Sequence, residues 1–504
     1  MKEIIRLIFL STALLLTFAN VNAQVDENAQ GYFNDALLFS RTVPGGTARI
    51  QAIGGAQVAL GGDISNIYSN PAGLGFFNRS QASFSPSLKF YDNDATYFGT
   101  ATNDSGSQLN FTNLGIVFSS PKFNDNSSWR GGSFGISYTK INNFNDQFTY
   151  EGANPNTSII DQFLESASGT FINDLGGLNG LAYDAYLINP EFDANQNIID
   201  GQYTSFVLGL PVQGEVVTTE GSQSQWSFSY GGNVADRFYF GFGLGIASVN
   251  YEQNKIYTES EFDHPDPGIN DLSIRETLKI DGTGINATVG FIYRPNDYIR
   301  IGGSLVTPTY YQFDEESDAV IEANYGGFFY EPDNKTLNNE RAESDIFVSQ
   351  YDLTTPLKLT GGLAFFIDKS GFISADVEYI DYSNNNLSSD NFSTTADNRT
   401  IEALYTSVVN FRVGGEYRYD VFRLRAGFGY YGDPHTAEDV DLSRTEFSVG
   451  AGLKLKNFYA DLGVIASSSN TRNYSPYSFA DGTGPASSIE TTNTNGVLTI
   501  GFNF

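Results

Sequence analysis

The sequence has 504 residues, with 28 Lys and Arg against 58 Asp and Glu, and a formal net charge of −30. This charge argues against a nucleic-acid partner, because phosphates attract basic side chains and repel carboxylates. The absence of cysteine excludes disulfides and thiolate chemistry, and an aromatic content of 14% together with 52 glycines is typical of a β protein.

Residues 1–23 have the features of a secretory signal peptide. Two basic residues precede an apolar stretch at residues 8–19, and small residues offer a cleavage site after Ala23. The apolar stretch is too short to cross a bilayer as a helix, which needs about 20 residues. We therefore expect an exported protein that begins near Gln24 and is either secreted or built into a membrane as β-strands.

Residues 24–79 do not alternate like the rest of the chain. Apolar and small residues recur at helical spacing after Arg49, Asp63 can cap a short helical turn, and Asn70-Pro71 ends that turn. This pattern predicts a small helical piece, which we call the hatch. The hatch spans residues 24–79, and the apolar residues in its first part that we expect to contact a ligand are Phe33, Leu37, Leu38 and Phe39.

Residues 80–504 alternate between apolar and polar side chains with period two, which predicts strands. The strands are unusually long, aromatic residues flank their aliphatic centres, and short and long connections alternate, as in outer-membrane barrels. The expected strands span residues 80–91, 109–119, 131–149, 211–232, 237–254, 272–293, 298–311, 346–367, 371–384, 401–417, 421–431, 441–455, 458–468 and 492–504. Long connections are expected near 93–107, 150–210, 255–271, 313–345, 385–400, 432–441 and 469–491.

The predicted fold is therefore all-β: a transmembrane antiparallel β-barrel of about 14 strands with a small helical N-terminal hatch inside the lumen. The terminal Phe504 on a period-two strand fits a recognition signal for the barrel assembly machinery. Gly241, Gly243 and Gly245 leave a bare stripe on one strand face, against which the hatch can pack closely.

The longest connection, residues 150–210, contains apolar residues at helical spacing. This spacing predicts a helix that includes Ile159, Ile160, Phe163 and Leu164. The helix either caps the mouth of the barrel or offers Phe163 and Leu164 as a landing site for an apolar ligand.

Charged residues at inward positions come from three consecutive strands, and opposite charges in neighbouring strands attract. They are Asp376, Glu378, Arg412, Glu416, Arg423 and Arg425. Two interpretations remain open. The charges form a network that stiffens the wall and anchors the hatch, or Arg412, Arg423 and Arg425 form a basic spot for a ligand carboxylate.

Residues suited to catalysis or metal binding are few. His264 and His435 lie in acidic loops without ligand-spaced partners, and Asp193 begins a calcium-like loop that lacks the required glycine and glutamate. We therefore expect no enzyme, no metal site and no cofactor.

Two hatch segments carry a resemblance to a known family. Residues 50–56 (IQAIGGA) and the turn Asn70, Pro71, Ala72, Gly73, followed by Leu74, resemble the hatch of the FadL/OmpP1/TodX family of outer-membrane transport proteins. Weaker similarity follows at residues 355–362 (TPLKLTGG), 431–434 (YGDP), 448–453 (SVGAGL) and 457–461 (NFYAD).

The resemblance implies a fourteen-stranded barrel in the outer membrane of a Gram-negative bacterium, surrounded by lipid and plugged by the hatch. It also implies uptake of hydrophobic small molecules such as long-chain fatty acids, which leave sideways through an opening in the wall. We predict a passive channel. Two interpretations of the Asn70–Gly73 turn remain open: it is the gate of the channel, or it is a rigid turn that holds the hatch in register. Two alternatives remain: a barrel that acts as a docking or assembly partner in protein secretion, and a haemin-binding receptor.

Overall fold

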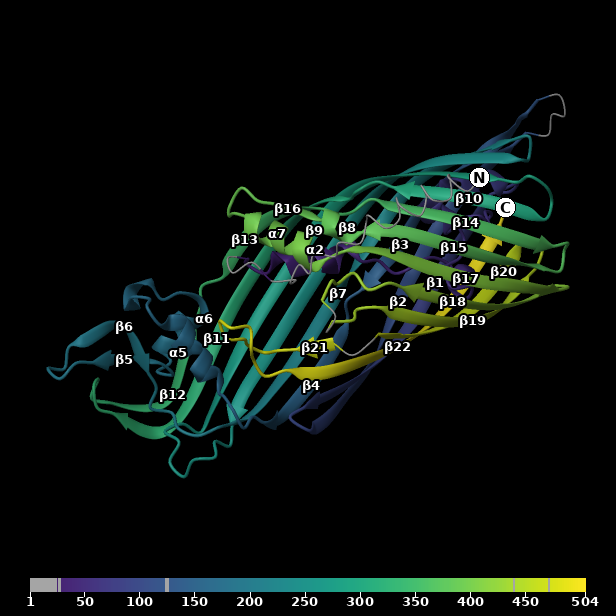
Figure 1. Cartoon of the computed structure of the whole chain (residues 1–504). Coiled ribbons are helices and arrows are strands. Elements are labelled where there is room, and N and C mark those ends of the chain that lie inside the picture. Colours follow the sequence, from purple (N-terminus) through teal and green to yellow (C-terminus); the bar gives the residue numbers. More distant parts are fainter. Residues whose placement is uncertain (1–24, 26–28, 123–126, 438–439, 470–471) are drawn as a thin grey trace, which may run out of the picture.

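The computed structural model describes residue 25 and residues 29–122, 127–437, 440–469 and 472–504, so the predicted signal peptide at 1–23 lies outside the described residues. The described residues form a closed antiparallel barrel of 14 strands, some of them interrupted, around a few N-terminal helices (Figure 1). The predicted fold class is confirmed. Among the described helices, none is both long and apolar enough to cross a membrane.

Neighbouring strands of the wall pair antiparallel, and β1 pairs with β22 to close the barrel. Three of the 14 strands are interrupted and consist of two segments each: β3 and β4, β10 and β11, and β13 and β14. The strands of the wall are β1 (Gln81–Tyr97), β2 (Thr100–Pro121), β3 (Trp129–Asn143), β4 (Asp146–Ala153), β7 (Val212–Val234), β8 (Phe238–Ser260), β9 (Asp271–Tyr293), β10 (Ile299–Val306), β11 (Tyr310–Tyr330), β13 (Phe347–Thr354), β14 (Lys358–Ile367), β15 (Gly371–Asp381), β17 (Ser407–Tyr419), β18 (Phe422–Tyr431), β19 (Arg444–Lys454), β20 (Phe458–Ser469) and β22 (Ser487–Asn503). Outward positions carry large apolar side chains such as Phe84 and Phe447, which are 45% and 62% exposed, as a wall bathed in lipid requires.

The two ends of the barrel differ in their connections. The short-turn end holds the brief connections that follow β2, β7, β9, β14, β17 and β19, and the chain also enters β1 and leaves β22 there. The loop end holds the long connections. A lobe built from α5 (Ile159–Ala167), α6 (Gly177–Asp184), β5 (Asn189–Phe192), β6 (Ile198–Thr204) and β12 (Lys335–Glu343) projects beyond it, at the left of Figure 1.

The first loop-end connection is a tight turn and not the long loop expected at residues 93–107. β1 and β2 stay paired up to Tyr97 and Thr100, so only Phe98 and Gly99 connect them. Both residues have positive φ, 44° and 85°, as a two-residue hairpin turn between twisted strands requires. The expected loop at 313–345 is likewise mostly a hairpin, formed by β11 and β12.

Two neighbouring strands that we expected to be continuous, residues 298–311 and 346–367, are each broken at a Thr-Pro step. Proline cannot donate to the ladder, and β10 gives way to β11 around Pro308, as β13 gives way to β14 around Pro356. The two breaks lie side by side, because the amide of Thr355 donates to the carbonyl of Thr309 over 3.0 Å.

The expected strand at 401–417 begins later than predicted, at Ser407, because α7 (Thr395–Leu404) occupies the preceding residues. The buried face of α7 consists of Asp397, Thr400, Ile401 and Leu404, which is the spacing of one helix face. The expected strand at 131–149 is divided between β3 and β4. The short strands β16 (Asn386–Ser388) and β21 (Arg472–Tyr474) and the 3₁₀ turns η2 (Ile172–Asp174) and η3 (Tyr382–Asn384) complete the loop end.

The hatch fills the lumen with four short elements: α2 (Tyr32–Ser40), α3 (Ala48–Gln51), α4 (Asn66–Ser69) and the 3₁₀ helix η1 (Pro71–Phe76). Its apolar side chains are almost completely buried; Ile50, Ile53 and Ile64 are each 0% exposed. Small wall residues make this packing possible. A side chain at Gly241 would overlap the backbone of Pro71, so the glycine stripe receives the hatch as predicted at this position, while Gly245 faces wall side chains instead.

Candidate functional site

The Asn70 side chain ties together three parts of the molecule. Its amide nitrogen donates to the carbonyl of Val58, over 2.7 Å, and to that of Phe291 on β9, over 3.3 Å. Its amide oxygen accepts from the amide of Ala72 over 3.2 Å and so caps η1, whose first residue is Pro71. Asn70 is 0% exposed. The predicted gate turn is therefore a buried hub, although its role as a gate stays a prediction.

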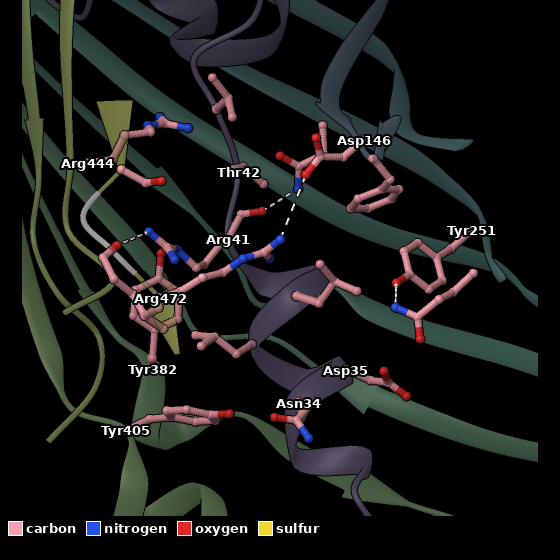
Figure 2. Close-up of a pocket in the computed structure, with 18 of the residues that line it drawn as sticks. Asn34, Asp35, Arg41, Thr42, Asp146, Tyr251, Tyr382, Tyr405, Arg444 and Arg472 are labelled. Atoms are coloured by element: carbon pink, nitrogen blue, oxygen red, sulfur yellow. Dashed lines mark hydrogen bonds and ion pairs between the residues drawn. The ribbon is translucent and has the colours of Figure 1, made fainter. Parts of the chain in front are cut away.

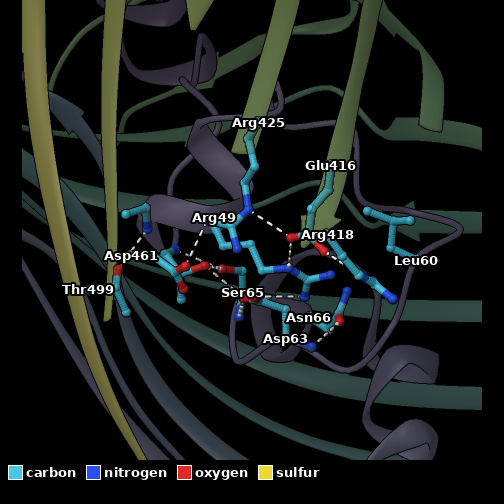
Figure 3. Close-up of polar contacts among 12 residues, drawn as sticks. Arg49, Leu60, Asp63, Ser65, Asn66, Glu416, Arg418, Arg425, Asp461 and Thr499 are labelled. Atoms are coloured by element: carbon cyan, nitrogen blue, oxygen red, sulfur yellow. Dashed lines mark hydrogen bonds and ion pairs between the residues drawn. The ribbon is translucent and has the colours of Figure 1, made fainter. Parts of the chain in front are cut away.

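An ion-pair network fastens the hatch near the short-turn end (Figure 3). Arg49 of α3 contacts the carboxylates of Asp63 and Glu416, each over 3.3 Å. Glu416 of β17 also binds Arg425 of β18 over 2.8 Å, and Arg425 reaches Asp461 of β20 over 2.7 Å. These charges are buried, and a buried ion pair is costly to break because the remaining charge is left unpaired.

A second anchor lies on the next strand of the wall. The carboxylate of Asp376 on β15 accepts from the backbone amides of Gln57 and Val58, over 2.8 and 3.0 Å. Asp376 is directly opposite Arg412 in the strand register, and Arg412 pairs with Glu378 over 3.3 Å. The inward charges thus bind one another and the hatch, which supports the network interpretation.

The structure does not bring the three predicted carboxylate-binding arginines into one spot. Arg412 pairs with Glu378, and Arg425 pairs with Glu416 and Asp461. Arg423 lies beside the turn after β17, where it donates to the carbonyls of Asp420 and Phe422. Their binding of a ligand carboxylate stays a prediction.

A cavity of about 850 Å³ lies on the loop-end side of the hatch. α2 forms one side of it and several wall strands form the other, as Figure 2 shows for Asp35 and Arg41 among the surrounding side chains. The lining is mixed: apolar and aromatic side chains (Leu37, Leu38, Phe144, Tyr251, Leu278, Tyr382, Tyr405) share it with cations (Arg41, Lys255, Arg444, Arg472) and with carboxylates (Asp35, Asp146, Glu315). Such a cavity suits a ligand with a large apolar part and a small polar part.

The predicted ligand-contacting residues are distributed over three places. Leu37 and Leu38 line this cavity. Phe39 is 1% exposed and packs against Phe313, with ring centroids 4.8 Å apart, while Phe33 packs against the same apolar cluster. Phe163 and Leu164 lie in the core of the loop-end lobe, on the predicted helix. Ligand contact by any of them stays a prediction, but only the first two line the cavity.

α7 holds the start of α2, an arrangement that sequence analysis missed. The carboxylate of Asp397 accepts from the amides of Gln30 and Phe33, over 3.0 and 3.2 Å, and so supplies the cap that Gly31 lacks. The spacing of buried residues in α7 was a visible signal for a helix, but nothing in the sequence indicated that its partner lies more than 360 positions away.

Docking of α2 is expected to weaken as pH rises. Burial raises the pKa of the Asp35 carboxyl to about 7, with Glu315 and Asp397 acting in the same direction against a hydrogen bond from Tyr351. An exposed Asp35 would have a pKa of about 4. The undocked helix therefore ionises first, so docking is strongest below pH 4, weakens between about pH 4 and 7, and changes no further above pH 7.

Hydrogen-exchange protection factors of α2 at pH 5 and pH 8 test this prediction. We expect lower protection at pH 8 in the natural protein and equal protection in Asp35→Asn. Equal protection at both values in the natural protein, or an equal fall in the variant, would contradict it.

A second pocket, of about 220 Å³, adjoins the cavity and shares Val43, Asn142 and Arg444 with it. It lies where the wall is incompletely closed. The ladder between β2 and β3 ends at the pair Asn113 and Thr139. From that pair toward the loop end, among the described residues, β2 is paired with β1 alone, and β3 and β4 are paired with β7 alone.

In the described part of the chain, hydrogen bonds that each involve at least one side chain, and no backbone ladder, bridge this seam, which we call the β2–β3 gap. Lys140 donates to the amide oxygen of Asn110 over 2.8 Å, and Asn143 donates to Gln108 over 3.2 Å. Outside the gap, Leu109 is 78% exposed. Side-chain contacts open more readily than a strand ladder, so β2 and β3 separate more easily at the gap than where they are paired.

Neither histidine lines the cavity: His264 is in an exposed loop and bonds to the backbone of Asp266, and His435 forms a bridge with Tyr405, behind the lining. Across the part of the chain that the structure describes, no group of three or more His, Asp or Glu could hold a metal ion.

No family model and no curated protein matches the chain. Solved structures do. A FadL homologue from Pseudomonas aeruginosa is 14% identical, covers 92% of this chain and 100% of its own, and has a TM-score of 0.57. The toluene transporter TbuX of Ralstonia pickettii is 15% identical, covers 92% and 99%, and has a TM-score of 0.52. The toluene transporter TodX of P. putida is 14% identical, with the same coverage and a TM-score of 0.50.

These similarities extend over nearly the whole chain at low sequence identity, and they establish the fold. The chain has a FadL-type barrel. The resemblance seen in the hatch motif is thus confirmed at the level of the fold.

Proposed function

We propose that this protein is a passive outer-membrane channel for hydrophobic small molecules. The observation that carries the proposal is a continuous series of three spaces beside the hatch: the cavity, the adjoining pocket and the β2–β3 gap. The similarity to two structures described as toluene transporters supports it. In such barrels short turns face the periplasm and long loops face outward, so a ligand would enter the cavity from outside the cell.

The hatch keeps the ligand from leaving along the barrel axis. Its backbone packs directly on wall glycines and its charges are paired with the wall, so the axial route is closed unless the hatch moves. The gap leads to the lipid instead. An apolar molecule that passes between Asn110 and Lys140 reaches lipid near Leu109 without crossing the hatch.

Long-chain fatty acids are the ligand class that we propose. The cavity combines leucine and aromatic side chains for an acyl chain with Arg41, Arg444 and Arg472 for a carboxylate. Hatch displacement, centred on Asn70, is the proposed way in which access between the cavity and the gap is regulated.

Cross-linking the gap tests the route. The chain has no cysteine, so the pair Asn110→Cys and Lys140→Cys can be joined by a short bifunctional thiol reagent. We expect cross-linking to abolish the protein-dependent uptake of labelled oleate by cells, because the exit to lipid is then closed. Uptake that continues after complete cross-linking would rule out this exit.

The matched control joins the same two strands where they are already paired. Phe118 and Phe134 are register partners on the outer face, so cross-linking Phe118→Cys to Phe134→Cys should leave uptake unchanged. Loss of uptake in this control would point to general damage to the barrel rather than to closure of the gap.

A further inference from the structure

The short-turn end carries the opposite charge to the rest of the chain. Among the described residues, its turns and their flanking residues, with the entry to β1, hold eleven basic residues and four acidic ones, although acidic residues outnumber basic ones two to one overall. The basic residues are Arg79, Lys122, Arg130, Arg237, Arg294, Arg300, Lys369, Arg418, Arg423, Lys454 and Lys456, and the acidic ones are Asp236, Asp297, Asp368 and Asp420. An asymmetry of this size indicates an anionic partner at this end.

A cavity of about 860 Å³ lies within this basic region, between the underside of the hatch and the wall turns. Six cations line it, from the hatch and from four different parts of the wall: Arg49, Arg294, Arg300, Lys369, Arg418 and Lys454. Only two carboxylates, Asp297 and Asp368, line the same space. Three of the six cations are already paired: Arg49 and Arg418 with Glu416, and Arg294 with Asp297. Arg300, Lys369 and Lys454 form no ion pair among the described residues, so the surplus of positive charge in the cavity rests on these three.

The side chain of Arg300 is fixed at the boundary between the hatch and the wall. Its guanidinium lies between the rings of Phe76 and Phe366, 4.3 and 4.1 Å from the centroids, and donates to the carbonyl of Leu60. Its buried Nε has no hydrogen-bond partner, and no carboxylate lies within ion-pair distance of it among the described residues. A fixed guanidinium with spare donors is suited to binding an oxyanion.

Lys369, in the turn between β14 and β15, and Lys454, the last residue of β19, both line the cavity. Across the described residues, neither ammonium group forms an ion pair or a side-chain hydrogen bond. Neighbouring cations that lack an ion-pair partner repel one another, and an anion placed between them would relieve that repulsion.

We propose that this short-turn cavity binds a phosphate group, with Arg300, Lys369 and Lys454 as its principal contacts. Phosphate supplies several acceptor oxygens and more than one negative charge, which suits a cavity whose cationic side chains surround it on several sides. Two sources offer this chemistry: the head group of a phospholipid in the leaflet beside the short turns, and a soluble phosphate compound. The proposal does not depend on what the channel transports.

A bound phosphate would also hold the hatch in place. Arg49 belongs to the hatch, and Arg300 contacts the hatch residues Leu60 and Phe76, whereas Lys369 and Lys454 belong to the wall. An anion bound among them adds an attraction that is shared by the hatch and the wall. We therefore expect phosphate binding to increase hydrogen-exchange protection of residues 57–62.

Calorimetric titration of the full-length protein with inorganic pyrophosphate, at constant ionic strength in a non-ionic detergent, tests the proposal. We expect saturable binding of one pyrophosphate per chain, and at least about tenfold weaker binding in Lys369→Gln/Lys454→Gln. Arg275→Gln/Lys279→Gln is the matched control, because it removes two exposed cations from β9 far from the short turns, and its binding should be unchanged.

Nanodiscs distinguish the two sources. If a lipid head group is the natural occupant, pyrophosphate binds in phosphatidylcholine nanodiscs but is displaced in phosphatidylglycerol nanodiscs; if the occupant is soluble, both lipids give the same affinity. Absence of saturable binding, equal affinity in the Lys369→Gln/Lys454→Gln variant, or an equal loss in the control variant would overturn the proposal.

Discussion

Replacing Gly427 by valine is expected to displace the hatch from the wall. The new side chain would overlap the backbone of Ile53 and Gly54, which are fixed parts of the hatch and cannot move aside as a flexible side chain could. Overpacking of this kind costs about 1–3 kcal/mol or more. The barrel itself has no reason to unfold, because its strand ladders remain intact.

Single-channel conductance in planar bilayers measures this displacement. The natural protein should be almost closed to ions, because the hatch fills the lumen, and Gly427→Val should open frequently. Gly361 on β14 is the matched control, since a side chain there would meet nothing within 4 Å, and Gly361→Val should behave like the natural protein. A closed Gly427→Val channel, in a correctly folded barrel, would contradict displacement of the hatch, and an open natural protein would show that the hatch does not block the lumen.

The second large effect is expected from Asn70→Ala. This change removes the donors to Val58 and Phe291 and the acceptor for Ala72. Each buried group left without a partner costs about 1–3 kcal/mol, and all three effects act on the hatch or on its contact with β9. We expect much faster hydrogen exchange in residues 66–76, with unchanged exchange in the wall strands.

Asn70→Asp separates the capping of η1 from the two hydrogen bonds that the Asn70 side chain donates. The carboxylate keeps an acceptor for the amide of Ala72, but it cannot donate to Val58 or Phe291. Exchange in Asn70→Asp should therefore fall between that of the natural protein and that of Asn70→Ala. If uptake and hatch exchange are both normal in Asn70→Ala, Asn70 is not a gate element.

Much of the barrel is visible in the sequence because each wall residue faces either lipid or the lumen, and this leaves a period-two pattern. The prediction at residues 93–107 was wrong because the pattern is polar on both faces where β1 and β2 extend beyond the lipid. The breaks at Pro308 and Pro356 had a visible signal in proline itself, since a proline cannot join a central ladder.

The site was less predictable, because it depends on contacts between distant parts of the chain. The spacing of Arg412 and Arg425 shows that both face inward, but only the strand register shows that Asp376 and Glu416 lie directly opposite them. The β2–β3 gap also has no sequence signature, since it exists where two strands stop pairing with each other while each still pairs on its other side.

The most direct test of the channel is uptake by a Gram-negative host that lacks its own channels for hydrophobic compounds. Cells with and without this protein would be given labelled oleate and, separately, labelled toluene at low concentration, after the folded barrel has been detected in the outer membrane. We predict faster initial uptake of at least one of them in cells with the protein, and the same stimulation after collapse of the proton gradient, because the channel is passive. Equal uptake of both compounds with and without the protein would contradict a channel for hydrophobic molecules.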